Sequence, residues 1–248
     1  MTVFATTVQA RMGSSRLPGK VLEEAVGRPM LELMVERLKR VPSGGPVIIC
    51  TTTNPADDAI CALGERLDVG VWRGSEDDVL GRVLGAARAY GVDVIIETTG
   101  DCPLIDPDVV ESVISSYRAS SVDYASNILT RSYPIGMDTQ IFSTEVLADV
   151  ARRTDDATDH EHVSLFIYHH PEFYSLKNVP APPELTWPDL RLTLDTPEDL
   201  ALIREIFECL YPDDPAFTLR DIVRLLRARP ELANLNAQVR HRWVQRSA

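Results

Sequence analysis

The chain has 248 residues, of which 44% are apolar, and this length and composition suit a single large α/β domain. Its formal net charge of −12 disfavours nucleic acid as a partner, because binding to a phosphate backbone requires a basic surface. No apolar run reaches membrane-spanning length and the N-terminus lacks a signal-peptide pattern, so we expect a cytoplasmic protein without a membrane partner.

The first half of the chain alternates predicted strands with predicted helices. Short apolar runs predict strands over 3–9, 46–52, 69–73 and 92–98. Apolar residues at helical spacing predict helices over 29–41, 57–67 and 75–90, and a fourth helix begins at Asp106-Pro107. Ser75 is the expected N-cap of the third helix. This order predicts a mainly parallel, Rossmann-like sheet with helices on both faces.

The second half of the chain is less regular. It predicts strands over 122–127, 137–142, 173–179 and 191–195, and helices over 143–153, 156–170, 196–207 and 219–227. We expect residues 1–228 to form one domain, in which 128–190 is a subregion for acceptor binding or dimerisation. Residues 229–248 are polar and are expected to form a C-terminal tail.

The first predicted strand runs into a cationic, glycine-containing loop with the sequence Gln9-Ala-Arg-Met-Gly-Ser-Ser-Arg-Leu-Pro-Gly-Lys20. Glycines allow close approach of the backbone, exposed N–H groups face an anion, and the loop carries three cations, Arg11, Arg16 and Lys20. This pattern at the carboxyl end of a buried strand predicts a polyphosphate site. The spacing fits neither a Walker A loop nor the dinucleotide-binding glycine motif.

Two aspartates are candidates for the metal partner of such a phosphate site. Asp101 follows the predicted strand 92–98, and Asp195 ends the predicted strand 191–195. If both strands run parallel to the first, both carboxylates lie at the same edge of the sheet as the cationic loop. Magnesium commonly takes one or two carboxylates and completes its shell with water and phosphate oxygens. Asp195 is equally placed to N-cap the helix that follows it.

Three segments of the chain together resemble a known family. They are the loop 9–20, Gly100-Asp101-Cys-Pro-Leu, and Arg191-Leu-Thr-Leu-Asp195-Thr-Pro-Glu-Asp199. They are similar to the cytidylyltransferases that make CMP-activated acidic sugars, such as the CMP-3-deoxy-manno-octulosonate and CMP-acylneuraminate synthetases, and most of all to the spore coat polysaccharide biosynthesis protein F branch. The resemblance covers roughly residues 2–210 and implies a nucleotide-diphospho-sugar transferase-like fold.

The resemblance implies a magnesium-dependent transfer of CMP from CTP to an acidic sugar or another small polar acceptor, with release of pyrophosphate. Arg11, Arg16 and Lys20 are then catalytic and hold the triphosphate, and Asp101 and Asp195 hold Mg²⁺. The other nucleotide-binding positions that it implies are Ala10, Gly13, Ser14, Arg73, Ser75 and Thr99. The sialate and octulosonate enzymes carry a glutamine at or near the position of Thr99, where it helps to read cytosine, so cytosine specificity rests on the resemblance alone.

The acceptor side is implied by position within the family. Tyr133, Gly136 and Asp138 match the general place of the sugar-binding region, and His162 lies where the family has a histidine near the active site. Asp138 is as well explained by a role in fixing its own loop. The family also implies a homodimer.

Two other functions remain open. A glycosyltransferase shares this fold and uses a finished nucleotide sugar, but three cations in one loop suit a triphosphate better than a diphosphate sugar. A non-catalytic nucleotide-binding subunit is the second alternative, and the presence of both candidate metal aspartates argues against it. Pyrophosphate release separates the transferase from both.

Overall fold

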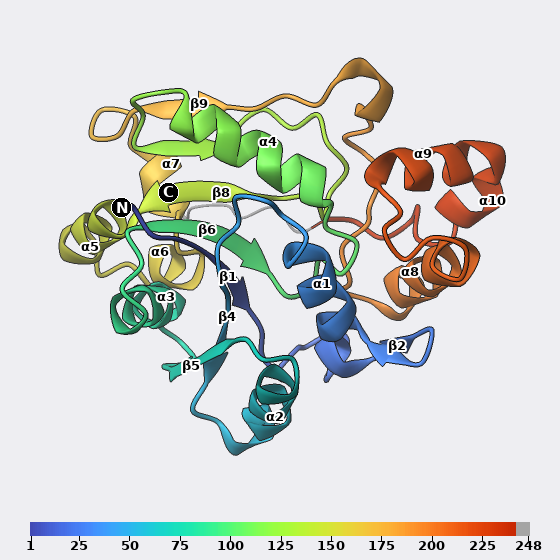
Figure 1. The fold of residues 1–248 in the computed structure, drawn as a ribbon, viewed down its shortest axis with the longest axis horizontal. Helices are drawn as coiled ribbons and strands as arrows, with labels where there is room; N and C mark the ends of the chain where they lie inside the picture. Colours follow the sequence, from blue (N-terminus) through green and yellow to red (C-terminus); the bar gives the residue numbers. More distant parts are fainter. Residues whose placement is uncertain (242–248) are drawn as a thin grey trace.

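The computed structural model describes residues 1–241, and at their centre is a seven-stranded sheet in the order β5-β4-β1-β6-β8-β7-β9 (Figure 1). The strands are β1 (Phe4–Gln9), β4 (Val47–Thr52), β5 (Gly70–Gly74), β6 (Val94–Thr99), β7 (Tyr124–Ser126), β8 (Gln140–Ser143) and β9 (Leu176–Asn178). Only β8 runs antiparallel to its two neighbours, β6 and β7. The predicted mainly parallel sheet is confirmed.

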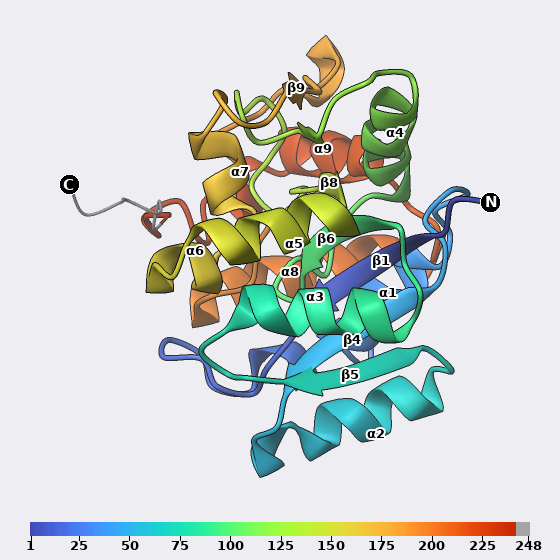
Figure 2. The ribbon, with the colours of Figure 1, turned by 90° about the vertical axis from the view of Figure 1, so that its left-hand side faces the viewer.

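Helices cover both faces of the sheet, as predicted (Figure 2). One face carries α1 (Met30–Leu38), α2 (Asp58–Arg66) and α4 (Pro107–Arg118). The other carries α3 (Val79–Ala89), α5 (Thr144–Arg153), α6 (Ala157–Glu161) and α7 (Leu165–His169). The alternation of strand side chains sets the two cores, since Val8 and Ile96 face α1 and α4 whereas Ala5 and Ile95 face α3 and α5.

A third apolar cluster lies beside the sheet, around the helices drawn in orange and red in Figure 1. It joins α8 (Pro197–Leu210), α9 (Leu219–Ala228) and α10 (Pro230–Ala233) to the face of α1 that turns away from the sheet. Of the predicted tail 229–248, the described part begins with α10, and Asn236 is buried and donates to Asp199. Residues 242–248 lie outside the described residues.

The remaining elements are short. A hairpin of β2 (Glu24–Ala25) and β3 (Arg28–Pro29) precedes α1, and three 3₁₀ turns occur at Lys20–Leu22, Pro55–Asp57 and Pro183–Leu185. Within the described residues no helix has both the length and the apolar character needed to cross a bilayer.

Three sequence-based expectations were wrong in detail. The N-cap of α3 is Asp78, whose carboxylate accepts from the Gly81 N–H, and Ser75 instead accepts from the Asp78 N–H. The predicted helix 156–170 is broken into α6 and α7, because Val163 takes a left-handed conformation with φ 46°. Predicted strand 137–142 begins only at Gln140, since the residues before it bond to the Asn127 side chain.

The predicted strand 191–195 was also wrong. Only Arg191 makes a bridge, to Ile135, and the segment otherwise lies outside the sheet. Arg191 and Asp195, at the two ends of the segment, form ion pairs. Leu192 and Leu194 are buried in the apolar cluster beside α8. Because they alternate with polar residues, the sequence of this segment resembles that of a strand.

The order of the strands locates a crevice. From β1 the chain moves outward to β4 and β5 on one side, and then returns to place β6 on the other side of β1. The carboxyl ends of β1 and β6 therefore flank the point where the strand order reverses. In open α/β sheets, ligands bind in the crevice at this point.

Candidate active site

Three charged side chains that are distant in the sequence meet at this crevice. Lys20 follows Gly19, which turns the loop with φ 72°, Asp101 follows β6, and Asp195 precedes α8. Lys20 Nζ lies 3.1 Å from Asp101 Oδ2 and 2.7 Å from Asp195 Oδ1. We call Lys20, Asp101 and Asp195 the acidic centre. The structure thus brings together the cation and the two carboxylates that the sequence placed at one sheet edge.

Mutual pairing decides the charge state of the acidic centre. Burial opposes the charge on Lys20, but the two carboxylates outweigh it and raise the pKa of this lysine. Burial likewise opposes ionisation of Asp195, yet Lys20 and then Arg191 and Arg16 outweigh it and lower the pKa of Asp195 to about 2. Lys20 and Asp195 are therefore both charged at neutral pH.

A buried network holds Asp195 in place from behind. Arg191 Nη2 lies 2.6 Å from Asp195 Oδ2, and its Nε lies 2.9 Å from Asp199 Oδ1. Asp199 is fully buried and accepts from the backbone N–H groups of Asp195 and Thr196. Asp195 is therefore not the N-cap of α8. Thr196 is, in a capping box with Asp199.

The sequence did not predict the supporting roles of Arg191 and Asp199, which it showed only as parts of the motif 191–199. The signal was present in their spacing, because Arg191, Asp195 and Asp199 lie four residues apart. Asp57 was missed in the same way. It is buried, accepts from the Met12 N–H at 2.7 Å and from the hydroxyl groups of Thr51 and Thr52, and so fixes the start of the cationic loop.

The two arginines of the loop differ in their surroundings. Arg16 reaches the acidic centre, with Nη2 at 3.1 Å from Asp195 Oδ2. Arg11 is 42% exposed and makes one 3.4 Å contact, to Glu76. The same carboxylate lies close to the backbone of Gly13, since a Cβ atom added there would be 3.3 Å from Glu76 Oε1. The loop thus offers one cation tied to the centre and one open to solvent.

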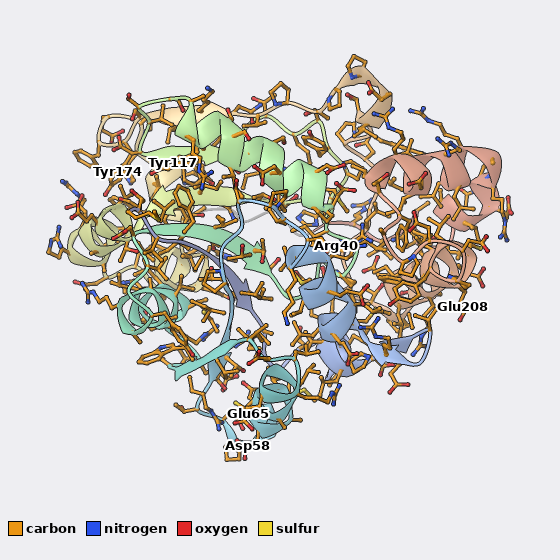
Figure 3. The ribbon with its side chains drawn as sticks, viewed as in Figure 1. Arg40, Asp58, Glu65, Tyr117, Tyr174 and Glu208 are labelled. Carbon is orange, nitrogen blue, oxygen red and sulfur yellow. The ribbon has the colours of Figure 1, made fainter. Side chains whose placement is uncertain are left out.

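Other predicted nucleotide-binding residues have local partners. The Arg73 guanidinium donates to the carbonyl groups of Thr52 and Asn54 and pairs with Asp58, which is labelled on α2 in Figure 3. Ser14 Oγ accepts from the Leu17 N–H. Arg73 therefore clamps the ends of β4 and β5 together in this structure.

At the centre of the sheet edge, Ala10 is buried against Gly100, where an added Cβ would lie 3.0 Å from the Ala10 side chain. Thr99 is paired with Gln9 across β1 and β6, and its hydroxyl group lies 3.5 Å from Cys102 Sγ. These contacts pack the loop start directly onto the end of β6.

The predicted acceptor residues have different surroundings. Asp138 forms a two-point ion pair with Arg131, with both N–O distances at 2.7 Å, and is thereby fixed to its own loop. Gly136 has φ 106° and its Cα lies against the Leu192 backbone, where a Cβ would approach to 2.7 Å. His162 is half-buried beside the break between α6 and α7, and burial lowers its pKa.

Tyr133 lines a cavity. Its side chain is 3% exposed, and the cavity, of about 480 Å³, lies between α4, α9 and the segment 179–185. Asp106, Val109, Leu185 and Leu219 also line this cavity, whereas the acidic centre does not. This cavity therefore does not connect Tyr133 with the acidic centre.

The acidic centre has the donor chemistry of a magnesium site. Its two carboxylates already converge on one positive charge, the Lys20 ammonium group. No group of three or more His, Cys, Asp and Glu side chains in the described chain has a metal-binding arrangement. Two carboxylates with phosphate and water oxygens are a common shell for Mg²⁺, so the residues present fit this ion.

Comparison with known proteins decides the family. A family model described as Cytidylyltransferase matches residues 5–228. This chain belongs to the cytidylyltransferase family. It is an enzyme of the nucleotidyltransferase class, as the resemblance of its motifs predicts.

This cytidylyltransferase has relatives along its whole length. It is 32% identical over 231 residues to the spore coat polysaccharide biosynthesis protein SpsF of Bacillus subtilis, covering 91% of this chain and 95% of that protein. It superimposes on a cytidylyltransferase structure from Leptospira borgpetersenii with a TM-score of 0.89 and 27% identity, covering 98% of this chain and 100% of that one.

A third similarity concerns the fold. A structure of CMP:2-keto-3-deoxy-manno-octonic acid synthetase in complex with CTP matches with a TM-score of 0.65 and 18% identity, covering 84% of this chain and 99% of that one. The nucleotide-diphospho-sugar transferase-like fold is confirmed.

Proposed function

We propose that this cytidylyltransferase, with Mg²⁺, transfers CMP from CTP to an acidic sugar or another small polar acceptor and releases pyrophosphate. The observation that carries the proposal is the acidic centre, in which Lys20 lies between Asp101 and Asp195 beside the cationic loop. An acceptor oxygen attacks the α-phosphorus of CTP. The bond between this phosphorus and the oxygen that bridges it to the β-phosphorus breaks, and pyrophosphate leaves.

The residues of this chain bind and position the triphosphate. Arg11 and Arg16 supply charge to the phosphate oxygens, and Lys20 stabilises the negative charge that develops on the leaving pyrophosphate. Asp101 and Asp195 would hold Mg²⁺, which, when bound, neutralises phosphate charge and polarises the phosphoryl oxygens. Arg191 and Asp199 keep Asp195 oriented for that role. Ala10, Gly13, Ser14, Arg73, Ser75 and Thr99 complete the nucleotide side.

The acceptor side of the proposal is Asp138, Gly136, His162 and Tyr133, within the subregion 128–190. The names of the relatives support a sugar acid destined for a surface polysaccharide as the acceptor. A homodimer in the cytoplasm is part of the same proposal.

The test is pyrophosphate release from CTP, UTP, GTP and ATP, with Mg²⁺ or with EDTA, over a panel of sugar acids. We expect release that depends on CTP, Mg²⁺ and an acceptor together. Turnover of a finished nucleotide sugar without pyrophosphate would instead favour a glycosyltransferase. Tight CTP binding without turnover on any acceptor would favour a non-catalytic subunit.

A further inference from the structure

Two polar side chains on the sheet are not used by the acidic centre. Gln9 is the last residue of β1, and Glu97 lies on the central strand β6, on the sheet face whose core also contains Ile95. Glu97 is 2% exposed. A carboxyl group buried at this depth costs free energy unless it makes compensating hydrogen bonds, so its place in the sheet needs an explanation.

The two side chains form a hydrogen bond between neighbouring strands. Gln9 Nε2 donates to Glu97 Oε1 at a distance of 2.7 Å. Gln9 lies directly opposite Thr99, and Thr7 directly opposite Glu97, so the contact runs diagonally between β1 and β6. These are the two strands between which the strand order of the sheet reverses. Gln9 is also the first residue of the cationic loop 9–20, so its side chain lies next to the proposed phosphate site.

The neighbour of Glu97 on β8 is already engaged. Gln140 lies opposite Glu97, and its Oε1 accepts from the Ser164 hydroxyl at 2.6 Å and the Tyr124 hydroxyl at 2.7 Å. Burial raises the pKa of Glu97 to about 7, and the hydrogen bond from Gln9 opposes this rise. Glu97 Oε2 is buried without a hydrogen-bond partner among the described residues, so the Gln9 amide is the group that Glu97 holds.

The contact fixes which end of the Gln9 amide faces the ligand. While Glu97 is ionised, its oxygens only accept, so the amide turns its nitrogen toward Glu97. The carbonyl oxygen, Gln9 Oε1, then lies on the other side of the amide group. Among the hydrogen bonds of the described residues, none engages this oxygen. The side chain is half-buried, and it presents an acceptor at the end of β1.

We propose that Gln9, oriented by Glu97, reads the base of the nucleotide, with its Oε1 accepting a hydrogen bond from the 4-amino group of cytosine. Cytosine offers an N–H donor at position 4, whereas a 4-oxo pyrimidine offers an acceptor there and would be repelled. Gln9 is a specificity-determining residue and Glu97 a positioning residue. The inference rests on the proposed function, because it assumes that the nucleotide phosphates lie at the loop 9–20.

The experiment measures the dissociation constants of CTP and UTP with Mg²⁺ by calorimetry, for the wild type, Glu97→Gln and Gln9→Leu. A double variant, Gln9→Leu with Glu97→Leu, removes the pair without leaving a buried acid unpaired. Gln238→Leu is the matched control, since this glutamine is exposed and, within the described residues, donates to the Leu235 carbonyl. Binding of inorganic triphosphate with Mg²⁺ reports whether each variant retains its fold and its phosphate site.

We expect the wild type and Gln238→Leu to prefer CTP, and the three pair variants to lose roughly tenfold or more of that preference. Affinity for inorganic triphosphate stays unchanged in all of them. An undiminished CTP preference in Glu97→Gln and in the double variant would overturn the inference and leave the proposed function standing. A wild type that binds inorganic triphosphate but does not prefer CTP, or that binds neither, would overturn both.

Discussion

Two carboxyl groups, the half-buried Asp195 and the buried Glu97, lie in opposite electrostatic surroundings. Asp195 has three cations around it, and its pKa is lowered to about 2 even though burial works against this. Glu97 accepts from the neutral Gln9 amide, and burial raises its pKa to about 7. The comparison shows that burial raises the pKa of a carboxyl group here unless, as at Asp195, cationic partners outweigh it. Asp195 suits a cation site, and Glu97 suits an orienting role.

The strongest way to break this contrast is Lys20→Ala. It removes the shared cation of Asp101 and Asp195 and the charge that we propose stabilises the leaving pyrophosphate, so kcat/KM for pyrophosphate release should fall roughly hundredfold to thousandfold. Lys39→Ala is the control, because this lysine is exposed and donates to the Leu67 carbonyl, away from the acidic centre. An equal turnover in Lys20→Ala and Lys39→Ala would remove Lys20 from the mechanism.

Asp199→Asn tests the network behind Asp195. Asp199 is fully buried and takes part in the ion pair with Arg191 and in the cap of α8. We expect the free energy of unfolding, measured in urea, to fall by roughly 3 kcal/mol, because the buried Arg191 loses a charged partner. Asp58→Asn removes the exposed pair with Arg73 and should lower the free energy of unfolding far less. Similar losses in the two variants would contradict the difference in burial.

Glu97→Gln sharpens the other side of the comparison. A carboxyl group whose pKa is raised by folding contributes stability that is fully present below its unfolded pKa and is lost as the pH rises to the folded pKa. Relative to Glu97→Gln, the wild type should therefore lose about 3 kcal/mol of unfolding free energy between roughly pH 4.5 and pH 7. Urea unfolding across that range measures the difference, and parallel curves for both proteins would show that Glu97 is not destabilised by burial.

The regular half of the molecule could be read from the sequence. The strands at 4–9, 47–52, 70–74 and 94–99 carry apolar runs bounded by turn residues, and Asp106-Pro107 begins α4 as expected. The second half could not be read as well. Its strands are short, and the break in the predicted helix 156–170 depends on one residue, Val163, in a conformation that its side chain disfavours.

The acidic centre illustrates a partial success. The sequence placed Asp101 and Asp195 near Lys20 through their positions at predicted strand ends, yet Asp195 does not end a strand. It arrives there because Arg191 and Asp199 anchor the start of α8. The pairing of Gln9 with Glu97 was not predictable, since it depends on the register between β1 and β6 and on a diagonal contact across it.

The most direct test of the acidic centre is CTP binding by calorimetry, with Mg²⁺ and with EDTA, for the wild type and Asp195→Asn. The account predicts that Mg²⁺ strengthens CTP binding to the wild type and that this dependence is lost in Asp195→Asn. CTP binding to the wild type that is equally strong in EDTA would contradict it, because the two carboxylates would then have no metal to hold.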